Sequence, residues 1–226
     1  MCERYALPEQ LAAEREFVPA QAWWSFSKRF NVSARQYVPS IRLHEGQSEA
    51  VMMSWGLVPS WTEGAPSQEP LLCVDAERLE ASPEHRMAWQ NSQRCILPIA
   101  GFYCWRLTSA RYRQPYFVHL VDRSVFGLAA IWDRWVSEGD DVIESCSLVC
   151  VPANGLMRQI VGTARYMPAI LRRRDYDIWL RGSIADAKSA LRPYQAKAMQ
   201  AYPVSPRVNS AAADDRSLIR PVRALA

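Results

Sequence analysis

The stretch Val125-Phe126-Gly127-Leu128-Ala129-Ala130-Ile131 is apolar throughout and follows a polar segment, Asp122 to Ser124. A short apolar run next to polar or turn-forming residues is typical of a β-strand. Runs of the same kind, apolar or β-branched and broken by Gly, Pro, Asn or Asp, occur at 36–42, 50–55, 94–98, 116–120 and 146–151. So many short strands predict a closed or strongly curved sheet.

Helical spacing is confined to short segments. Residues 8–14 form a candidate helix with Pro8 in its first turn, where the missing N–H costs little. Further helices are expected at 82–93, 175–180 and 184–191. The fold class is therefore α+β: a single domain, residues 1–226, with a curved antiparallel β-barrel-like core flanked by a few helices. Residues 210–226 lack a clear period, which predicts an extended tail, packed on the surface or frayed.

The composition indicates a globular chain. Of 226 residues, 49% are apolar and 22% are charged, with 11% aromatic, which is enough for a core and argues against general disorder. The net charge is +4 and the pI is near 8.8. This mild basic excess would suit a phosphate-binding face, but it is also common in proteins that bind no nucleic acid.

The expected compartment is the cytoplasm, and no membrane partner is expected. The start of the chain has no apolar run of signal-peptide type, and no stretch contains eighteen apolar residues in succession. In a reducing compartment the six cysteines should remain thiols. The three histidines, at 44, 85 and 119, are scattered. We therefore expect no metal site and no cofactor.

Eight short motifs occur in an order that resembles the SOS response-associated peptidase family. They run from the first residues to about residue 209, at 1–5, 29–32, 55–61, 94–103, 114–117, 144–146, 167–171 and 202–205. Each motif alone is a weak signal, but eight in order make coincidence improbable. The resemblance implies a compact β-barrel-like domain with a basic groove that binds single-stranded DNA containing abasic sites, next to the N-terminus. We expect a monomer.

Cys2 is the candidate nucleophile. A cysteine at the N-terminus offers an amine and a thiol on adjacent carbons, and this pair traps aldehydes such as the ring-opened sugar of an abasic site. The amine forms a Schiff base and the thiol then closes a five-membered thiazolidine. The reaction requires removal of Met1, by an aminopeptidase or by self-cleavage. The resemblance implies that Cys2 forms a DNA–protein crosslink in this way.

The residues that would support Cys2 depart from the family pattern. The pattern has an acid–base Glu after Gly-Phe-Tyr, where this chain has Cys104, and a His just before Met-Pro, where it has Ala164. The pattern also has an Asn that orients the nucleophile, followed by an Arg and a Glu. Asp75 matches the Asn if nothing is inserted, whereas Arg78 and Glu80 match the later Arg and Glu only with an extra residue. A thiol is a poor substitute for a carboxylate in proton transfer. Cys2, Asp75 and Cys104 are thus the candidate catalytic residues.

The expected DNA groove is better preserved. Arg4 and Arg78 are candidates for phosphate contacts, Asn31 for hydrogen bonds to the backbone, and Trp61 for stacking on a base. Arg86 is a further candidate on a helix. Their alternatives are ordinary structural roles: Trp61 could be a core aromatic residue, as we expect Trp55 to be, and a lone helical arginine is usually solvated surface.

Two functions remain open at this point, and a third is weaker. The chain is either a covalent abasic-site sensor with self-peptidase activity or a relative that kept the DNA groove and lost the chemistry. The two differ in what Cys2 does. A general thiol protease is disfavoured, because no Cys–His pair with suitable neighbours can be identified.

Overall fold

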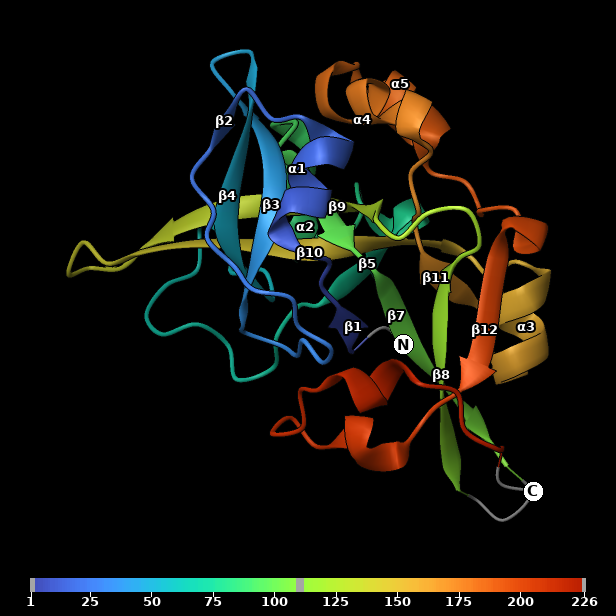
Figure 1. The fold of residues 1–226 in the computed structure, drawn as a ribbon. Coiled ribbons are helices and arrows are strands. Elements are labelled where there is room, and N and C mark those ends of the chain that lie inside the picture. Colours follow the sequence, from blue (N-terminus) through green and yellow to red (C-terminus); the bar gives the residue numbers. More distant parts are fainter. Residues whose placement is uncertain (1–2, 109–111, 225–226) are drawn as a thin grey trace.

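Five strands close into a barrel in the computed structural model, which describes residues 3–108 and 112–224 (Figure 1). Around the barrel the order is β10-β9-β6-β3-β4, and β4 meets β10 again in a parallel bridge between Trp55 and Cys146. The other neighbours run antiparallel. The strands are β3 (Tyr37–His44), β4 (Gln47–Trp55), β6 (Arg94–Ile99), β9 (Phe126–Val136) and β10 (Val142–Pro152). The predicted α+β class with a barrel-like core is confirmed.

A second, four-stranded antiparallel sheet stands beside the barrel. Its order is β1-β7-β8-β12, and β7 follows β6 after a single residue, Ala100. Its strands are β1 (Tyr5–Ala6), β7 (Gly101–Leu107), β8 (Arg113–Leu120) and β12 (Met199–Pro203). Three short strands extend the barrel sheet: β2 (Gln21–Ala22) on β4, with β5 (Cys73–Asp75) and β11 (Tyr166–Pro168) on β10. The N-terminal strand therefore joins the sheet that continues directly from the barrel.

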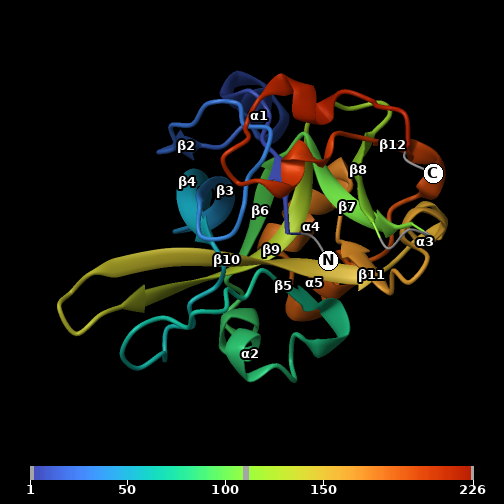
Figure 2. The same ribbon diagram turned by 90° about the horizontal axis from the view of Figure 1, so that it is seen from below.

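Five short α-helices lie around these sheets in the described part of the chain. They are α1 (Gln10–Phe17), α2 (Pro83–Gln90), α3 (Gly155–Val161), α4 (Tyr176–Arg181) and α5 (Ile184–Ala190). The first begins two residues after Pro8 rather than around it, so the predicted start was wrong. The helices expected at 82–93, 175–180 and 184–191 are confirmed within a few residues. Seen from below, α2 and β5 lie on one side of the β9–β10 hairpin and α1 on the other (Figure 2).

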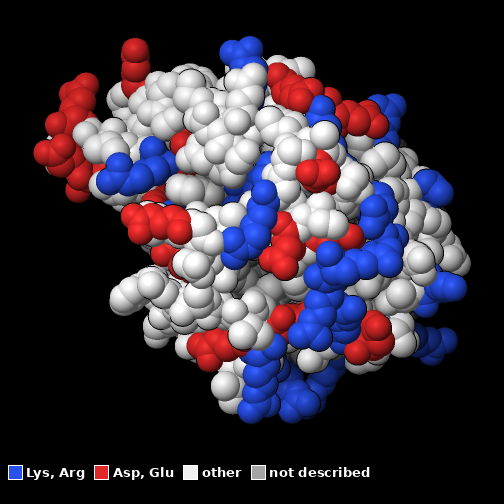
Figure 3. Space-filling model, turned by 90° about the horizontal axis from the view of Figure 1, so that it is seen from above, with Lys and Arg blue, Asp and Glu red and all other residues white. Residues whose placement is uncertain are grey.

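The opposite side of the molecule, seen from above, carries many basic side chains, which gather toward one part of this face (Figure 3). The α4–α5 pair lies at the top of the molecule in Figure 1. Just before α4, the chain forms the 3₁₀ turn η2 (Arg173–Asp175). Charge is thus unevenly distributed over the surface.

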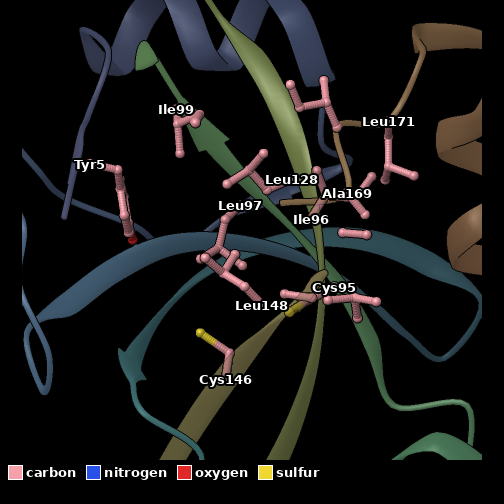
Figure 4. Packing of buried hydrophobic residues seen from close by; sticks show 14 of the residues in the cluster. Tyr5, Cys95, Ile96, Leu97, Ile99, Leu128, Cys146, Leu148, Ala169 and Leu171 are labelled. Atoms are coloured by element: carbon pink, nitrogen blue, oxygen red, sulfur yellow. The ribbon is translucent and has the colours of Figure 1, made fainter. Parts of the chain in front are cut away.

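The barrel interior is filled by apolar side chains and by two thiols, those of Cys95 and Cys146 (Figure 4). Burial raises the pKa of the Cys95 thiol well above its ordinary value. Trp55 is fully buried and its ring meets that of Tyr5 edge to face, with centroids 4.7 Å apart. The expectation that Trp55 is a core residue is confirmed.

The C-terminal segment packs against the second sheet and the N-terminal part of the chain. It contains the 3₁₀ turns η4 (Pro206–Asn209) and η5 (Arg216–Ile219), and the Leu218 side chain is fully buried. The Asp214 carboxylate accepts hydrogen bonds from the backbone N–H groups of Phe30 and Asn31, at 2.6 and 3.0 Å. Residues 220–224, which end the described part of this segment, are exposed.

Candidate functional site

The start of the described chain lies beside β7. Tyr5 pairs with Phe102, and the Tyr103 N–H donates to the Arg4 carbonyl at 3.0 Å. Continuing this antiparallel register brings Glu3 opposite Cys104, and both residues line a cavity of about 80 Å³ together with Trp105, Arg113 and Val161. Cys2 itself lies outside the described residues. The residue that follows Cys2 is therefore a neighbour of Cys104.

Cys104 is unsuited to acid–base work at neutral pH. Its side chain is buried, and burial raises the pKa of its thiol to about 12. A group that stays protonated to such a high pH is neither a base nor a thiolate nucleophile under ordinary conditions.

Asp75 and Cys73 lie on the short strand β5, two residues apart and hence on the same face of the strand. The strand runs parallel to β10, with Asp75 opposite Cys150. A hydrogen bond with the Cys150 thiol lowers the pKa of Cys73 to about 7, against the opposing effects of burial and of the negative charges of Asp75 and Glu3. The negative charges of Asp75 and Glu3 both raise the pKa of the Cys73 thiol. β5 and the N-terminal segment are therefore close enough for their charges to act on the same group.

The segment where the family pattern has a histidine forms the next neighbour of β10. In strand β11, Tyr166 pairs with Pro152, and the Ala153 N–H donates to the Arg165 carbonyl at 2.9 Å. Ala164 is buried and offers no titratable group. β5 and β11 therefore flank β10, and Asp75 is the carboxylate that β5 contributes.

Arg78 and Arg86 lie just beyond β5, and both side chains are exposed. Arg78 ends the 3₁₀ turn η1 (Ala76–Arg78), and its carbonyl accepts the Ser82 N–H at 2.7 Å at the entry to α2. Arg86 is on α2, one turn further on. The structure brings these two predicted phosphate ligands to the same end of β5.

Trp61 is held in a turn with half of its surface exposed, at 50%. The Asp133 carboxylate accepts the Ser60 N–H at 2.8 Å, and the Trp135 indole N–H donates to the Thr62 carbonyl at 2.8 Å. The ring borders a cavity of about 530 Å³ that also contacts Glu84 of α2. Trp61 is thus not a core residue, and its ring is available to a ligand near α2.

Arg4 and Asn31 have partners within the protein. The Asn31 amide nitrogen is fully buried and donates to the carbonyls of Val208, Ser210 and Ala213, at 3.2, 2.9 and 2.8 Å. Its side-chain oxygen accepts a hydrogen bond from Arg4 at 3.2 Å. The Asn31 side chain therefore has no free N–H for the hydrogen bond to DNA that the sequence predicted, because its amide anchors the C-terminal segment. Arg4 is only partly buried.

Three residues of this region, Glu3, Cys73 and Arg113, were missed in the sequence. Cys73 could have been found, since it stands two residues before Asp75 on a strand-like run. Glu3 stands in the motif at 1–5, but its proximity to Arg113 has no signal in the sequence, because the two residues meet only through the pairing of β1, β7 and β8. Among the described residues no group of His, Cys, Asp and Glu is arranged to hold a metal ion. No helix of the described chain is long and apolar enough to cross a membrane.

These features define a class: an α+β barrel protein whose candidate site is built around its N-terminal segment. A sequence model of the family described as "SOS response associated peptidase (SRAP)" matches residues 1–211. The chain belongs to this family, and the resemblance seen in its motifs is confirmed.

Relatives of the chain include abasic site processing proteins. It is 28% identical over 206 residues to "Abasic site processing protein YoqW" of Bacillus subtilis (strain 168), which covers 89% of this chain and 86% of the relative. It is 25% identical over 190 residues to "Abasic site processing protein HMCES" of Mus musculus, covering 71% of this chain and 53% of the relative. A crystal structure of a Bacteroides thetaiotaomicron protein superposes with a TM-score of 0.86 at 24% identity, covering 98% of this chain and 100% of that one, and shows the same fold.

Proposed function

We propose that this chain processes abasic sites in single-stranded DNA by forming a thiazolidine crosslink through Cys2, after its own peptidase activity or an aminopeptidase has removed Met1. One observation carries the proposal within the family: β1 pairs with β7 so that Glu3, the residue after Cys2, shares a cavity with Cys104 and an electrostatic environment with Asp75. β5, which carries Asp75, runs parallel to β10.

The proposed chemistry balances without a cofactor. Hydrolysis of the Met1–Cys2 peptide bond consumes one water and frees the Cys2 amine. The amine condenses with the C1′ aldehyde of the open sugar, releasing water and leaving an imine. The thiol sulfur adds to the imine carbon while its proton passes to the nitrogen, which closes the ring.

Asp75 is the proposed proton-transfer group. Cys104 stays protonated, since its thiol has a pKa of about 12, and Ala164 has no proton to give. A carboxylate within reach of the amine and the sugar oxygen can both accept and return a proton. Arg4, Arg78 and Arg86 are the proposed phosphate contacts, and Trp61 the base-stacking residue.

The first test mixes the purified chain, its N-terminus checked by intact mass, with an oligonucleotide that carries one abasic site. A crosslinked band on a denaturing gel is expected for the chain without Met1, and Cys2→Ala should abolish it while leaving native binding intact. Cys73→Ala is the matched control, because that thiol has a pKa of about 7 and is the other candidate nucleophile. A band that survives Cys2→Ala and disappears with Cys73→Ala would refute the proposal.

The second test concerns Asp75. The Asp75→Asn variant keeps the shape and the hydrogen-bonding capacity but removes proton transfer. Crosslinking should slow by about 100-fold, in the range typical of a general acid–base group. An unchanged or faster rate would show that the residue only orients the nucleophile.

The third test concerns DNA binding. Trp61→Ala should weaken affinity for single-stranded DNA by about tenfold, as expected for the loss of one stacked base. Trp23→Ala is the control, because Trp23 is another exposed tryptophan, at 71%, and lies beside β2. Equal effects of the two changes would remove Trp61 from the interface.

A second candidate function is a DNA-binding relative without covalent chemistry. The buried, neutral Cys104 and the buried Ala164 favour it, because both replace titratable groups of the family pattern. Binding of the abasic strand under native conditions without any crosslink, by a chain that lacks Met1, would decide for this function.

A further inference from the structure

A second basic groove lies outside the site described so far. Two adjacent cavities, of about 720 and 460 Å³, share the residues Asp122, Arg123 and Arg173. The first extends to Arg172, Arg174 and Tyr194, and the second to Arg15 and Glu16 of α1. We call this set of eight residues the arginine groove.

The groove carries an excess of positive charge. Five arginines and two carboxylates line the two cavities, a formal excess of three positive charges. That excess is most of the net charge of the whole chain, which is +4. Three separate segments contribute to it, at 15–16, 122–123 and 172–174, so the concentration of charge is produced by the fold and not by one basic run. None of the contacts proposed for the first site lies in the groove.

The guanidinium groups are incompletely neutralised. One carboxylate, that of Glu16, serves two arginines at long range, 3.7 Å to Arg123 and 3.8 Å to Arg173. The Arg123 Nη1 atom is buried and has no hydrogen-bond partner among the described residues. The Asp175 carboxylate lies 3.9 Å from Arg174 but only 2.8 Å from Arg192, which is its closer partner. No ion pair of Arg172 is formed within the described structure.

We infer that the arginine groove binds the phosphate backbone of a single-stranded nucleic acid. Guanidinium groups match phosphate oxygens in a bidentate geometry, and several in a row suit a polyanion better than a single small anion. Tyr194 adds an aromatic ring to the arginine-lined wall, a combination that serves base stacking in single-strand binding sites. The inference rests on the proposed function, which identifies the nucleic acid as DNA. It adds a second region of the protein that contacts the DNA strand.

The test uses the Arg172→Ala/Arg174→Ala double variant of the full chain. Arg134→Ala/Arg220→Ala is the control, since it removes the same charge from exposed positions elsewhere. Binding to oligo(dT) of about 30 nucleotides is measured over a salt series, because a strand of that length exceeds the site size of one small domain. In parallel, crosslinking is measured on an abasic oligonucleotide of about 10 nucleotides, which fits one site.

The double variant should lose about tenfold in affinity for the long strand at low salt, and its log–log salt slope should flatten by about 1.4, for two phosphate contacts. The control variant should retain both values, and Arg172→Lys/Arg174→Lys should keep the slope. Crosslinking of the short oligonucleotide should be unchanged.

Equal affinities and slopes for the double variant and its control would overturn the inference. So would a loss of binding to phosphatidylserine vesicles with unchanged oligo(dT) binding, which would assign the groove to a lipid headgroup. If the unmodified chain fails to crosslink but the double variant still flattens the slope, the proposed function falls and the arginine groove stands.

Discussion

Cys73 and Cys104 carry the same thiol group in different surroundings. Cys104 is enclosed in the middle of β7, and burial raises the pKa of its thiol to about 12. Cys73 is partly exposed and is hydrogen-bonded to Cys150, which lowers the pKa of its thiol to about 7. The local environment, and not the residue type, decides which of the two can ionise.

This contrast predicts selective alkylation. At pH 7.5, iodoacetamide should modify Cys73 at least 100-fold faster than Cys104, because only the thiolate reacts at an appreciable rate. Peptide mapping by mass spectrometry reads both sites in one sample, and the rate at Cys73 should rise to a plateau above about pH 8. Comparable rates at the two cysteines would contradict the buried position of Cys104.

His85 is the buried histidine of α2. Its ring nitrogens lie 2.7 Å from the Ser82 hydroxyl and 3.3 Å from the Ser147 hydroxyl. Burial lowers the pKa of the imidazole to about 4 from an ordinary value near 6.5. The folded protein therefore holds this ring neutral over a pH range in which the unfolded chain takes up a proton.

The stability of the domain should consequently fall as the pH drops from about 6.5 to about 4, by about 3 kcal/mol at 1.4 kcal/mol per pH unit. The folded pKa is the lower one, so this contribution is fully present above pH 6.5. Urea unfolding at several pH values measures it. His85→Gln should remove most of the dependence, whereas His44→Gln, at an exposed position, should preserve it.

Short elements are where prediction from the sequence failed. The strand β5 has three residues and β1 has two, so neither contains a period, and each is defined by its partner strand. Helix α3 was missed because it begins at Asn154-Gly155, a pair typical of turns. Here the Asn154 side chain caps the helix by accepting the Met157 N–H at 3.0 Å.

The role of Asn31 in the candidate site also could not be predicted from the local sequence. An asparagine in a family motif suggested a contact with DNA, but its amide meets carbonyl groups about 180 residues further along the chain. No local pattern could reveal that pairing. By contrast, the longer strands at 50–55, 94–98 and 125–131 were recognised, since continuous apolar runs persist whatever packs against them.

The anchoring role of Asn31 can be tested at the level of the C-terminal segment. Asn31→Asp replaces a donor by an acceptor that faces three carbonyls, and should destabilise the docked segment by about 3 kcal/mol. Limited trypsin digestion should then cut rapidly at Arg207 and Arg216. The exposed Asn91→Asp change is the control, and similar cleavage of both variants would refute the anchor.

The barrel closes through a short parallel pairing of β4 with β10, in which Ser54 also lies opposite Ser145. β4 and β10 meet at Trp55 and Cys146, and the Gly56 N–H donates to the Cys146 carbonyl at 2.9 Å. Gly56 has a φ of +130°, a conformation that L residues rarely adopt, and an added Cβ would lie 3.0 Å from the Cβ of Pro70. Glycine is therefore required where the sheet closes.

Gly56→Ala should lower the free energy of unfolding by about 3 kcal/mol, through backbone strain and this contact. Gly46→Ala is the matched control, because Gly46 also has a positive φ, +76°, but open space around its Cα. The control should lose only about 1 kcal/mol. Urea unfolding of both variants measures the difference, and equal losses would show that closure tolerates a side chain at position 56.

The closing contact also sets an order of events in folding. The partners β4 (Gln47–Trp55) and β10 (Val142–Pro152) are about 90 residues apart, so their pairing must overcome the entropy of a long loop. A nascent chain leaving the ribosome presents the free edge of β4 until β10 has emerged. We therefore expect slow synthesis or chaperone protection of that edge to raise the yield of native protein, since an unpaired strand edge is a surface on which incomplete chains aggregate.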